Sequence, residues 1–154
     1  MSEREAVVVT RRESSLEIET LLVRVRALGA AADWHFRLDS EREDPSEWSS
    51  GYFTPPGRKS PEVGVSNEPL DESDRDDLVA MCRKKGIGDR ESAVLAVATH
   101  RYEVEGAGEP GAKTASLFDA VALAIAELGD GIIVVRRPWG VFTPAAYRTH
   151  VSLD

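Results

Sequence analysis

Cysteine is nearly absent from this chain, since Cys82 is the only one among 154 residues. A single thiol excludes an intramolecular disulfide and a zinc site built from several cysteines, and it is typical of proteins in reducing compartments. Long apolar runs are also missing, because no window reaches the roughly 18 uninterrupted apolar residues of a transmembrane helix. The N-terminus shows no secretion-signal pattern. We therefore expect a cytoplasmic protein without a membrane partner.

Basic residues are outnumbered, with 19 lysines and arginines against 27 acidic residues and a net charge of -8. This balance argues against nucleic acid as the main partner, because that affinity comes chiefly from basic side chains on phosphates. The acidic excess is concentrated in two segments. Residues 39–47 carry five acidic side chains and one basic, and residues 68–77 carry six and one, while the rest of the chain is close to neutral.

The size and composition favour one domain with a real core. Hydrophobic residues make up 42% of the 154 positions, and no internal repeat or change in composition divides the chain. A chain of this length buries roughly 69% of its unfolded surface. We expect a single globular domain over residues 1–154, interrupted by a long acidic and aromatic loop at residues 39–61.

Hydrophobic periodicity indicates alternating strands and helices. Apolar residues at helical spacing, with capping residues and terminal glycines, predict helices. Alternating or β-branched runs predict strands. The expected strands are residues 6–10, 32–38, 62–66, 93–105 and 132–135, and the expected helices are residues 14–28, 70–85, 114–128 and a short one after Thr143-Pro144.

This order predicts an α+β fold. The first six elements match a ferredoxin-like β-α-β-β-α-β core, which a further helix, a strand and a short C-terminal helix would extend. We describe the expected architecture as a single-domain α/β sandwich. A doubly wound α/β topology stays open, because the adjacent second and third strands need not pair.

A glycine-rich segment at residues 106–114 lies between a predicted strand and a predicted helix, where phosphate-binding loops are found. Aligned on Lys113, however, the two glycines that a Walker A loop requires are Ala107 and Ala112. The next strand ends in Arg136 rather than in an aspartate for magnesium. The segment therefore predicts a turn before a helix, with weak anion binding at the helix start as the alternative.

The histidines do not form a recognisable metal motif. His35, His100 and His150 lack the spacing of a helical metal pair, so we predict neither a metal nor a cofactor. His35 and His100 could meet across a sheet and act as an acid-base pair, although ordinary strand positions are the favoured interpretation. Cys82 lies among apolar helix residues, which favours a buried side chain over a reactive thiolate.

Two further features indicate binding. Arg136 and Arg137 beside Trp139 could contact an anionic or planar ligand, although a turn covering the core is the commoner role. Acidic clusters steer basic partners and aromatic side chains anchor interfaces, although the acids could merely solvate the surface while the aromatics pack on the core. The predicted partner-binding residues are Asp39, Glu41, Glu43, Asp44, Glu47, Trp48, Tyr52, Phe53, Asp71, Glu72, Asp74, Asp76 and Asp77.

The sequence favours a binding protein over an enzyme. We expect a small acidic domain that occupies a basic surface of another protein, as immunity proteins and antitoxins do. Two alternatives stay open. One is a small-ligand-binding domain or enzyme that uses His35, His100, Arg136 and Arg137. The other is an accessory subunit that forms homo-oligomers.

Overall fold

The fold is that of a computed structural model of the chain. The described residues are 4–11, 16–28, 35–38, 48–54, 57, 63–106, 112–136 and 139–151; the side chains of 112–116 and 136 are not described. These residues form one mixed α+β domain, as the sequence predicts.

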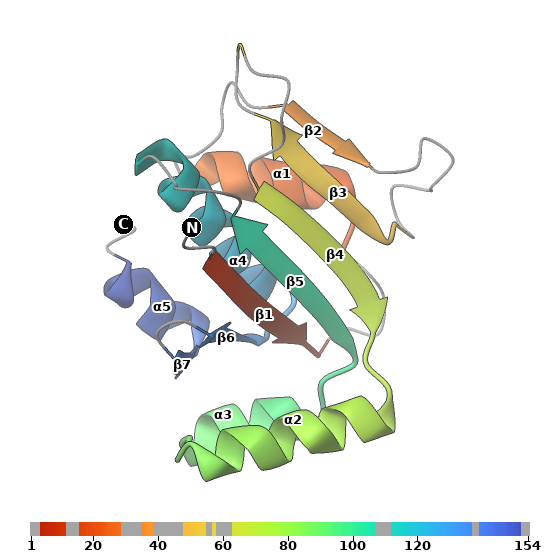
Figure 1. The fold of residues 1–154 in the computed structure, drawn as a ribbon, viewed down its shortest axis with the longest axis vertical. Helices are drawn as coiled ribbons and strands as arrows, with labels where there is room; N and C mark the ends of the chain where they lie inside the picture. The colour runs from red at the N-terminus through yellow and green to blue at the C-terminus, as the bar shows by residue number, and fades with distance from the viewer. Residues whose placement is uncertain are drawn as a thin grey trace.

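Seven strands form one antiparallel sheet in the order β2-β3-β4-β5-β1-β6-β7 (Figure 1). Five helices accompany the sheet. The elements are β1 (Arg4–Thr10), α1 (Ile18–Ala27), β2 (His35–Leu38), β3 (Ser50–Thr54), β4 (Val63–Pro69), α2 (Glu72–Lys84), α3 (Asp89–Ala96), β5 (His100–Gly106), α4 (Ala112–Leu128), β6 (Ile132–Arg136), β7 (Trp139–Phe142) and α5 (Pro144–His150).

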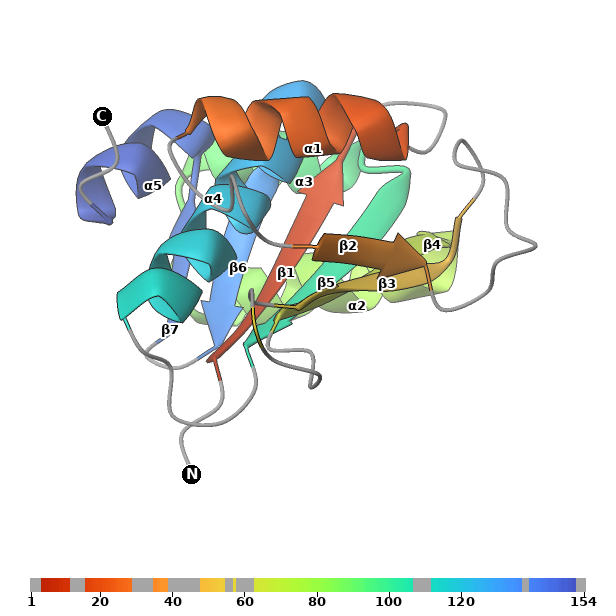
Figure 2. The same cartoon turned by 90° about the horizontal axis from the view of Figure 1, so that it is seen from above.

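One face of the sheet, here called the closed face, is covered by α1 and α4 (Figure 2). Helix α4 is buried over most of its length from Leu117 to Ala126. Its side chains pack against Ala6 and Val8 of β1 and against Ile133 of β6 in the main core. Burial of this apolar surface supplies most of the stabilisation of the domain.

The opposite face, here called the open face, is covered only in part. Leu70, Cys82 and Leu95 from α2, α3 and the turn before them pack on alternate residues of β1 and β6 in a second, smaller cluster. Both helices lie at one end of the sheet, and Figure 1 shows no described helix over β3, β4 and the far half of β5. Among the described elements, this part of the open face therefore carries no covering helix.

The expected β-α-β-β-α-β core is not made of the first six elements along the chain. Strands β4, β5, β1 and β6 lie side by side at the centre of the sheet. Taken with α1 and α4, these strands follow the β-α-β-β-α-β order along the chain, as β1, α1, β4, β5, α4 and β6. The strand predicted at residues 32–38, described as β2, instead lies at the edge of the sheet and pairs with β3. Strands β2 and β3 thus extend the sheet on one side.

Three elements differ from the predicted ones. The strand predicted at residues 93–105 is a helix, α3, followed by β5. Its first part belongs to a helix because Gly88 takes the extended N-cap conformation and the acidic Asp89 and Glu91 lie in the first turn, where they complement the helix dipole. Only Leu95 of this helix is buried, and Ala93 and Ala96 are exposed. The loop predicted at residues 39–61 contains β3, and the turn predicted after β6 contains β7.

The predicted capping residues are confirmed for two helices, α2 and α5. Asp71 caps α2 by accepting a hydrogen bond from the amide of Asp74 at 2.8 Å, and Gly86 has a φ of 80° just after the helix. Thr143 caps α5 through the amide of Ala146 at 3.3 Å. Helix α1 begins at Ile18, and the serines of its predicted capping box lie outside the described residues.

A buried polar network fixes the segments that enter the core without regular structure. The hydroxyl of Tyr102 accepts a hydrogen bond from the amide of Leu16 at 3.0 Å, and the indole of Trp48 donates to the Leu16 carbonyl at 2.7 Å. The Asn67 amide nitrogen donates to the Trp48 carbonyl at 2.9 Å. These bonds satisfy backbone groups that would otherwise be costly to bury.

Helix α5 is held against α4 by ionisable side chains. The Tyr147 hydroxyl donates to Asp119 at 2.8 Å, and Arg4 contacts the same carboxylate at 2.8 Å. Burial, together with the nearby Asp119 charge, raises the pKa of Tyr147 above its ordinary value. Glu127 accepts a hydrogen bond from Arg148 at 2.9 Å. No helix among the described residues combines the length and apolar character needed to span a bilayer.

Candidate partner-binding face

Strand β5 separates apolar from charged side chains. Tyr102 and Val104 are fully buried on the closed face. Arg101, Glu103 and Glu105 alternate with them and therefore lie on the open face. One strand thus supplies both the core and the charged surface.

Neighbouring strands bring further acidic residues next to those of β5. Glu105 pairs directly with Glu5 of β1, and Glu103 pairs with Ser66 of β4. Two like charges opposite each other in antiparallel strands destabilise a sheet. The Glu5 and Glu105 pair therefore concentrates negative charge on the open face.

Arg101 is the basic side chain within this acidic surface. It forms salt bridges with Glu103 and, at 3.9 Å between Nε and Oε1, with Glu68 of β4. Its Nε atom is buried and makes no hydrogen bond. One cation is thus shared between two carboxylates, so the surroundings of Arg101 keep a negative excess.

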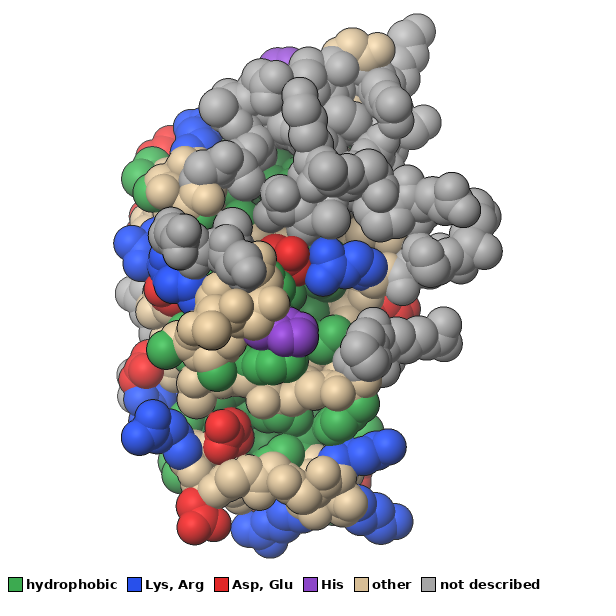
Figure 3. Space-filling model, turned by 90° about the vertical axis from the view of Figure 1, so that its left-hand side faces the viewer, with side chains coloured by type: hydrophobic (Ala, Val, Ile, Leu, Met, Phe, Trp, Pro, Cys, Tyr) green, Lys and Arg blue, Asp and Glu red, His purple; other side chains and the backbone are tan. Residues whose placement is uncertain are grey.

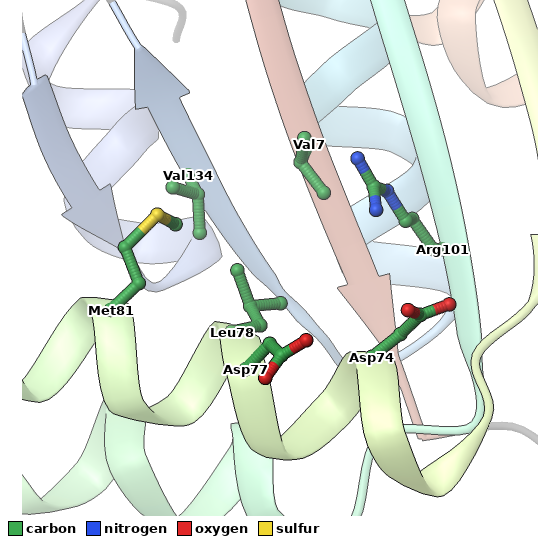
Figure 4. A pocket seen from close by; sticks show the side chains of 7 residues that line it. All are labelled: Val7, Asp74, Asp77, Leu78, Met81, Arg101 and Val134. Atoms are coloured by element: carbon green, nitrogen blue, oxygen red, sulfur yellow. The ribbon is translucent and has the colours of Figure 1, made fainter.

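Helix α2 adds two carboxylates and forms a notch with the sheet (Figure 4). Positions 74, 77, 78 and 81 lie on one side of the helix because they are three and four residues apart. Figure 4 shows the Asp74 and Asp77 carboxylates pointing into the space below Arg101. The notch has a volume of about 240 Å³ and is lined by Val7, Asp74, Asp77, Leu78, Met81, Arg101 and Val134.

A second hollow lies on the part of the open face without a described helix. It has a volume of about 310 Å³ and is formed by β3, β4 and β5. Small side chains make up its floor, with Tyr52 on one side and Glu103 and Glu105 on the other. The two hollows are neighbours, because Glu103 lies in the second and its salt-bridge partner Arg101 in the first.

The residues predicted to bind a partner fall into three groups. Asp39, Glu41, Glu43, Asp44 and Glu47 lie outside the described residues, so the loop stays a prediction.

The aromatic group is largely internal. Trp48 is 2% exposed and Phe53 is 1% exposed, and both belong to the main core. They cannot contact a partner without unfolding, so their role is packing, which was the alternative interpretation of the sequence. Tyr52 is half-buried and lines the hollow over β3 and β4.

The second acidic group lies on α2 and is exposed. Asp71 is accounted for by its capping bond. Asp74 and Asp77 face the notch. Glu72 and Asp76 are exposed on the same helix without lining either hollow. The structure thus separates this cluster into one capping residue, two residues in the notch and two others.

The histidines and arginines proposed for an alternative site do not converge. His35 pairs with Thr54 in β2–β3, whereas His100 pairs with Pro69 at the other end of β4. Three inter-strand spacings, or about 14 Å, also separate their strands. The side chain of Arg136 and all of Arg137 lie outside the described residues. The described residues therefore form no shared histidine site.

The environment of Cys82 does not favour a reactive thiolate. Cys82 is fully buried, and burial raises its pKa, which keeps the thiol protonated. Most of the glycine-rich segment, residues 107–111, lies outside the described residues. Within the described part of the chain, no group of three or more His, Cys, Asp or Glu side chains is arranged to hold a metal ion.

Basic side chains gather at the C-terminal end of α2. Arg83 and Lys84 lie in the last turn of α2, and Lys85 lies over the Trp139 ring at 5.5 Å. Figure 3 shows the side of the molecule with β7 and α5, where lysine and arginine side chains lie at the lower end. The contact of Trp139 with the second core cluster agrees with a covering role for this residue.

Sequence reasoning missed several of the acidic residues on the open face. Glu5, Glu103 and Glu105 stand outside both acidic segments, and their strands bring them together. The alternation of charged and apolar residues from Arg101 to Glu105 was a usable signal for an exposed strand face. Strand order was needed to show that Glu5 is adjacent.

Comparisons of the chain with protein-family models, with curated proteins and with solved structures find no match.

Proposed function

We propose that this protein binds a basic partner protein through the open face of its sheet. One observation carries the proposal: acidic side chains from β1, β4 and β5 on the open face converge with those on the adjoining side of α2. They are Glu5, Glu68, Asp74, Asp77, Glu103 and Glu105.

The arrangement has the properties of a steering surface. Charges of one sign on a concave surface raise the local concentration of oppositely charged partners and speed association. The apolar floor of the notch, formed by Val7, Leu78 and Val134, gives the aliphatic stem of a lysine or arginine a place to bury. Recognition would thus combine charge with burial of apolar surface.

Immunity proteins and antitoxins are one class that occupies a basic partner in this way, and we extend the proposal to that class as the kind of activity to test first. The binding role predicted for the acidic residues of segment 39–47 stays part of the same proposal. The single, buried Cys82 agrees with a reducing compartment such as the cytoplasm, which is part of the same proposal.

A charge-reversal experiment tests the proposal. The probe is a fluorescent arginine-rich peptide, and its affinity for the full chain is measured by anisotropy at low and high salt. We expect the double variant Asp77→Lys, Glu105→Lys to bind about tenfold more weakly or worse, and the salt dependence to decrease.

The matched control is the double variant Glu17→Lys, Glu19→Lys. Both residues are exposed at the start of α1, in the helix layer that covers the closed face, and so lie on the side opposite the open face. Reversing their charges changes the net charge by the same amount as the first double variant does. We expect nearly unchanged affinity at physiological salt. An equal loss of affinity in both double variants would mean that net charge alone attracts the peptide, and it would overturn the proposal.

A further inference from the structure

The structure shows no steric or backbone requirement for a glycine at position 64. It lies within β4, where glycine weakens a strand because it lacks a side chain to pack and loses more entropy on folding. A Cβ atom placed on Gly64 meets no atom within 4 Å, and its φ is not in the left-handed region. The fold itself would therefore accept a larger residue here.

Other described glycines contrast with Gly64. Gly57 and Gly86 have positive φ angles, and a Cβ on Gly51 would lie 2.4 Å from the Phe36 ring. A Cβ on Gly131 would lie 2.0 Å from a backbone oxygen. Gly64 alone among the described glycines combines an ordinary φ with open space at Cβ. A glycine inside a strand often marks the close approach of a ligand or of another chain.

The neighbours of Gly64 define what could approach. In the sheet register Gly64 pairs with Tyr52 of β3 on one side and with Glu105 of β5 on the other. Tyr52 and Glu105 are therefore about 10 Å apart, two strand spacings, with no side chain between them. All three residues line the hollow of about 310 Å³.

We propose that this gap accepts an arginine side chain of the basic partner. The stem of the arginine lies across Gly64, the guanidinium stacks on the Tyr52 ring, and its N–H groups donate to Glu105. This inference rests on the proposed function and names the recognised group within that surface.

Arginine fits the gap better than lysine. A planar guanidinium stacks on aromatic rings and donates two parallel hydrogen bonds to one carboxylate, whereas an ammonium is a compact point charge with a stronger hydration shell. The flat floor at Gly64 and the pairing of a ring with a carboxylate match the planar group. The notch near Asp74 and Asp77 lacks an aromatic ring among its lining residues and is not expected to discriminate.

The test fills the gap without disturbing the fold. Gly64→Ala, Gly64→Val and Gly64→Leu add increasing bulk where the structure has open space. We expect unfolding midpoints no lower than in the wild type, and a graded loss of affinity for the arginine-rich peptide that reaches about tenfold with leucine. Tyr52→Leu should weaken the same peptide several-fold, whereas Tyr52→Phe, which keeps the ring, should not.

A lysine-rich peptide of the same length and charge separates this inference from the proposed function. We expect the wild type to prefer the arginine peptide, and Tyr52→Leu to remove that preference. Equal binding of both peptides, or unchanged binding by Gly64→Leu, would overturn the inference while the charge-reversal result still supports the proposed function. Failure of the wild type to bind either peptide would overturn both.

Discussion

The two faces of the sheet use the same strands for different purposes. On the closed face Tyr102 and Val104 of β5 are fully buried under α1 and α4. On the open face Arg101, Glu103 and Glu105 of the same strand are charged and accessible in part. Since successive side chains of a strand point to opposite faces, five consecutive residues provide both surfaces.

The contrast between the two faces separates residues that serve folding from residues that do not. Side chains of the closed face are complementary to their neighbours, as the network of Trp48, Leu16 and Tyr102 shows. Side chains of the open face include a repulsive pair, Glu5 and Glu105, and a glycine that the fold does not need, Gly64. Proteins keep such locally unfavourable features mainly at functional sites. The closed face should therefore control stability and the open face binding.

The largest expected effect concerns Trp48. Trp48→Ala should lower the free energy of unfolding by about 3–5 kcal/mol, because the ring is 2% exposed and its indole donates to the Leu16 carbonyl. Urea denaturation measures the change. Val23→Ala, at a position 65% exposed on α1, is the control and should stay within about 0.5 kcal/mol of the wild type. A small effect at Trp48 would place this residue back among the partner-binding candidates.

A medium effect is expected at Tyr147. Tyr147→Phe removes the hydroxyl that donates to Asp119 and should cost about 1 kcal/mol at neutral pH. Because burial and Asp119 raise the pKa of Tyr147, the folded protein keeps the proton while the unfolded chain releases it near pH 10.

The contribution of the Tyr147 hydroxyl to the free energy of unfolding is therefore fully present below pH about 10 and decreases as the pH rises above that value. The measurement is the unfolding free energy of wild type and Tyr147→Phe between neutral and alkaline pH. The difference between the two proteins should shrink in alkaline solution. Parallel curves would show that the hydroxyl is not buried as described.

The smallest effect on stability has the opposite sign. Glu5→Gln or Glu105→Gln should raise the free energy of unfolding by about 0.5 kcal/mol, because each removes one of two like charges facing each other across β1 and β5. The gain should decrease in high salt. Thermal denaturation at two salt concentrations measures it. A loss of stability in both variants would mean that the open face contributes to folding and would break the contrast between the faces.

Much of the fold was predictable where one periodicity dominated. The apolar stripe of α4 and the dipole-matched ends of α2 predict those helices, and both are confirmed. The run from Ala93 to Val97 was predicted as a strand, because a short apolar segment fits either a strand or a helix. The helix start at Gly88 is what identifies this segment as helical. Strand order could not be predicted, because β4 and β5 pair across an insertion of two helices.

The site was predictable in part. The acidic start of α2 was found because charge clustering is visible in the sequence, and Asp74 and Asp77 face the notch. Glu5 and Glu105 were not found, because they are adjacent only in the sheet. Trp48 and Phe53 were misjudged as candidates because an aromatic residue in a polar segment can equally fold into the core, as both do.

The most direct test of the central claim is a map of the surface that contacts a basic ligand. Isotope-labelled protein is titrated with the arginine-rich peptide, and changes in amide chemical shift are recorded by two-dimensional NMR. Our account predicts that the largest changes occur at Gly64, Glu103, Glu105 and Asp77, on the open face. Changes concentrated on α1 and α4, or on the side with β7 and α5, would contradict it.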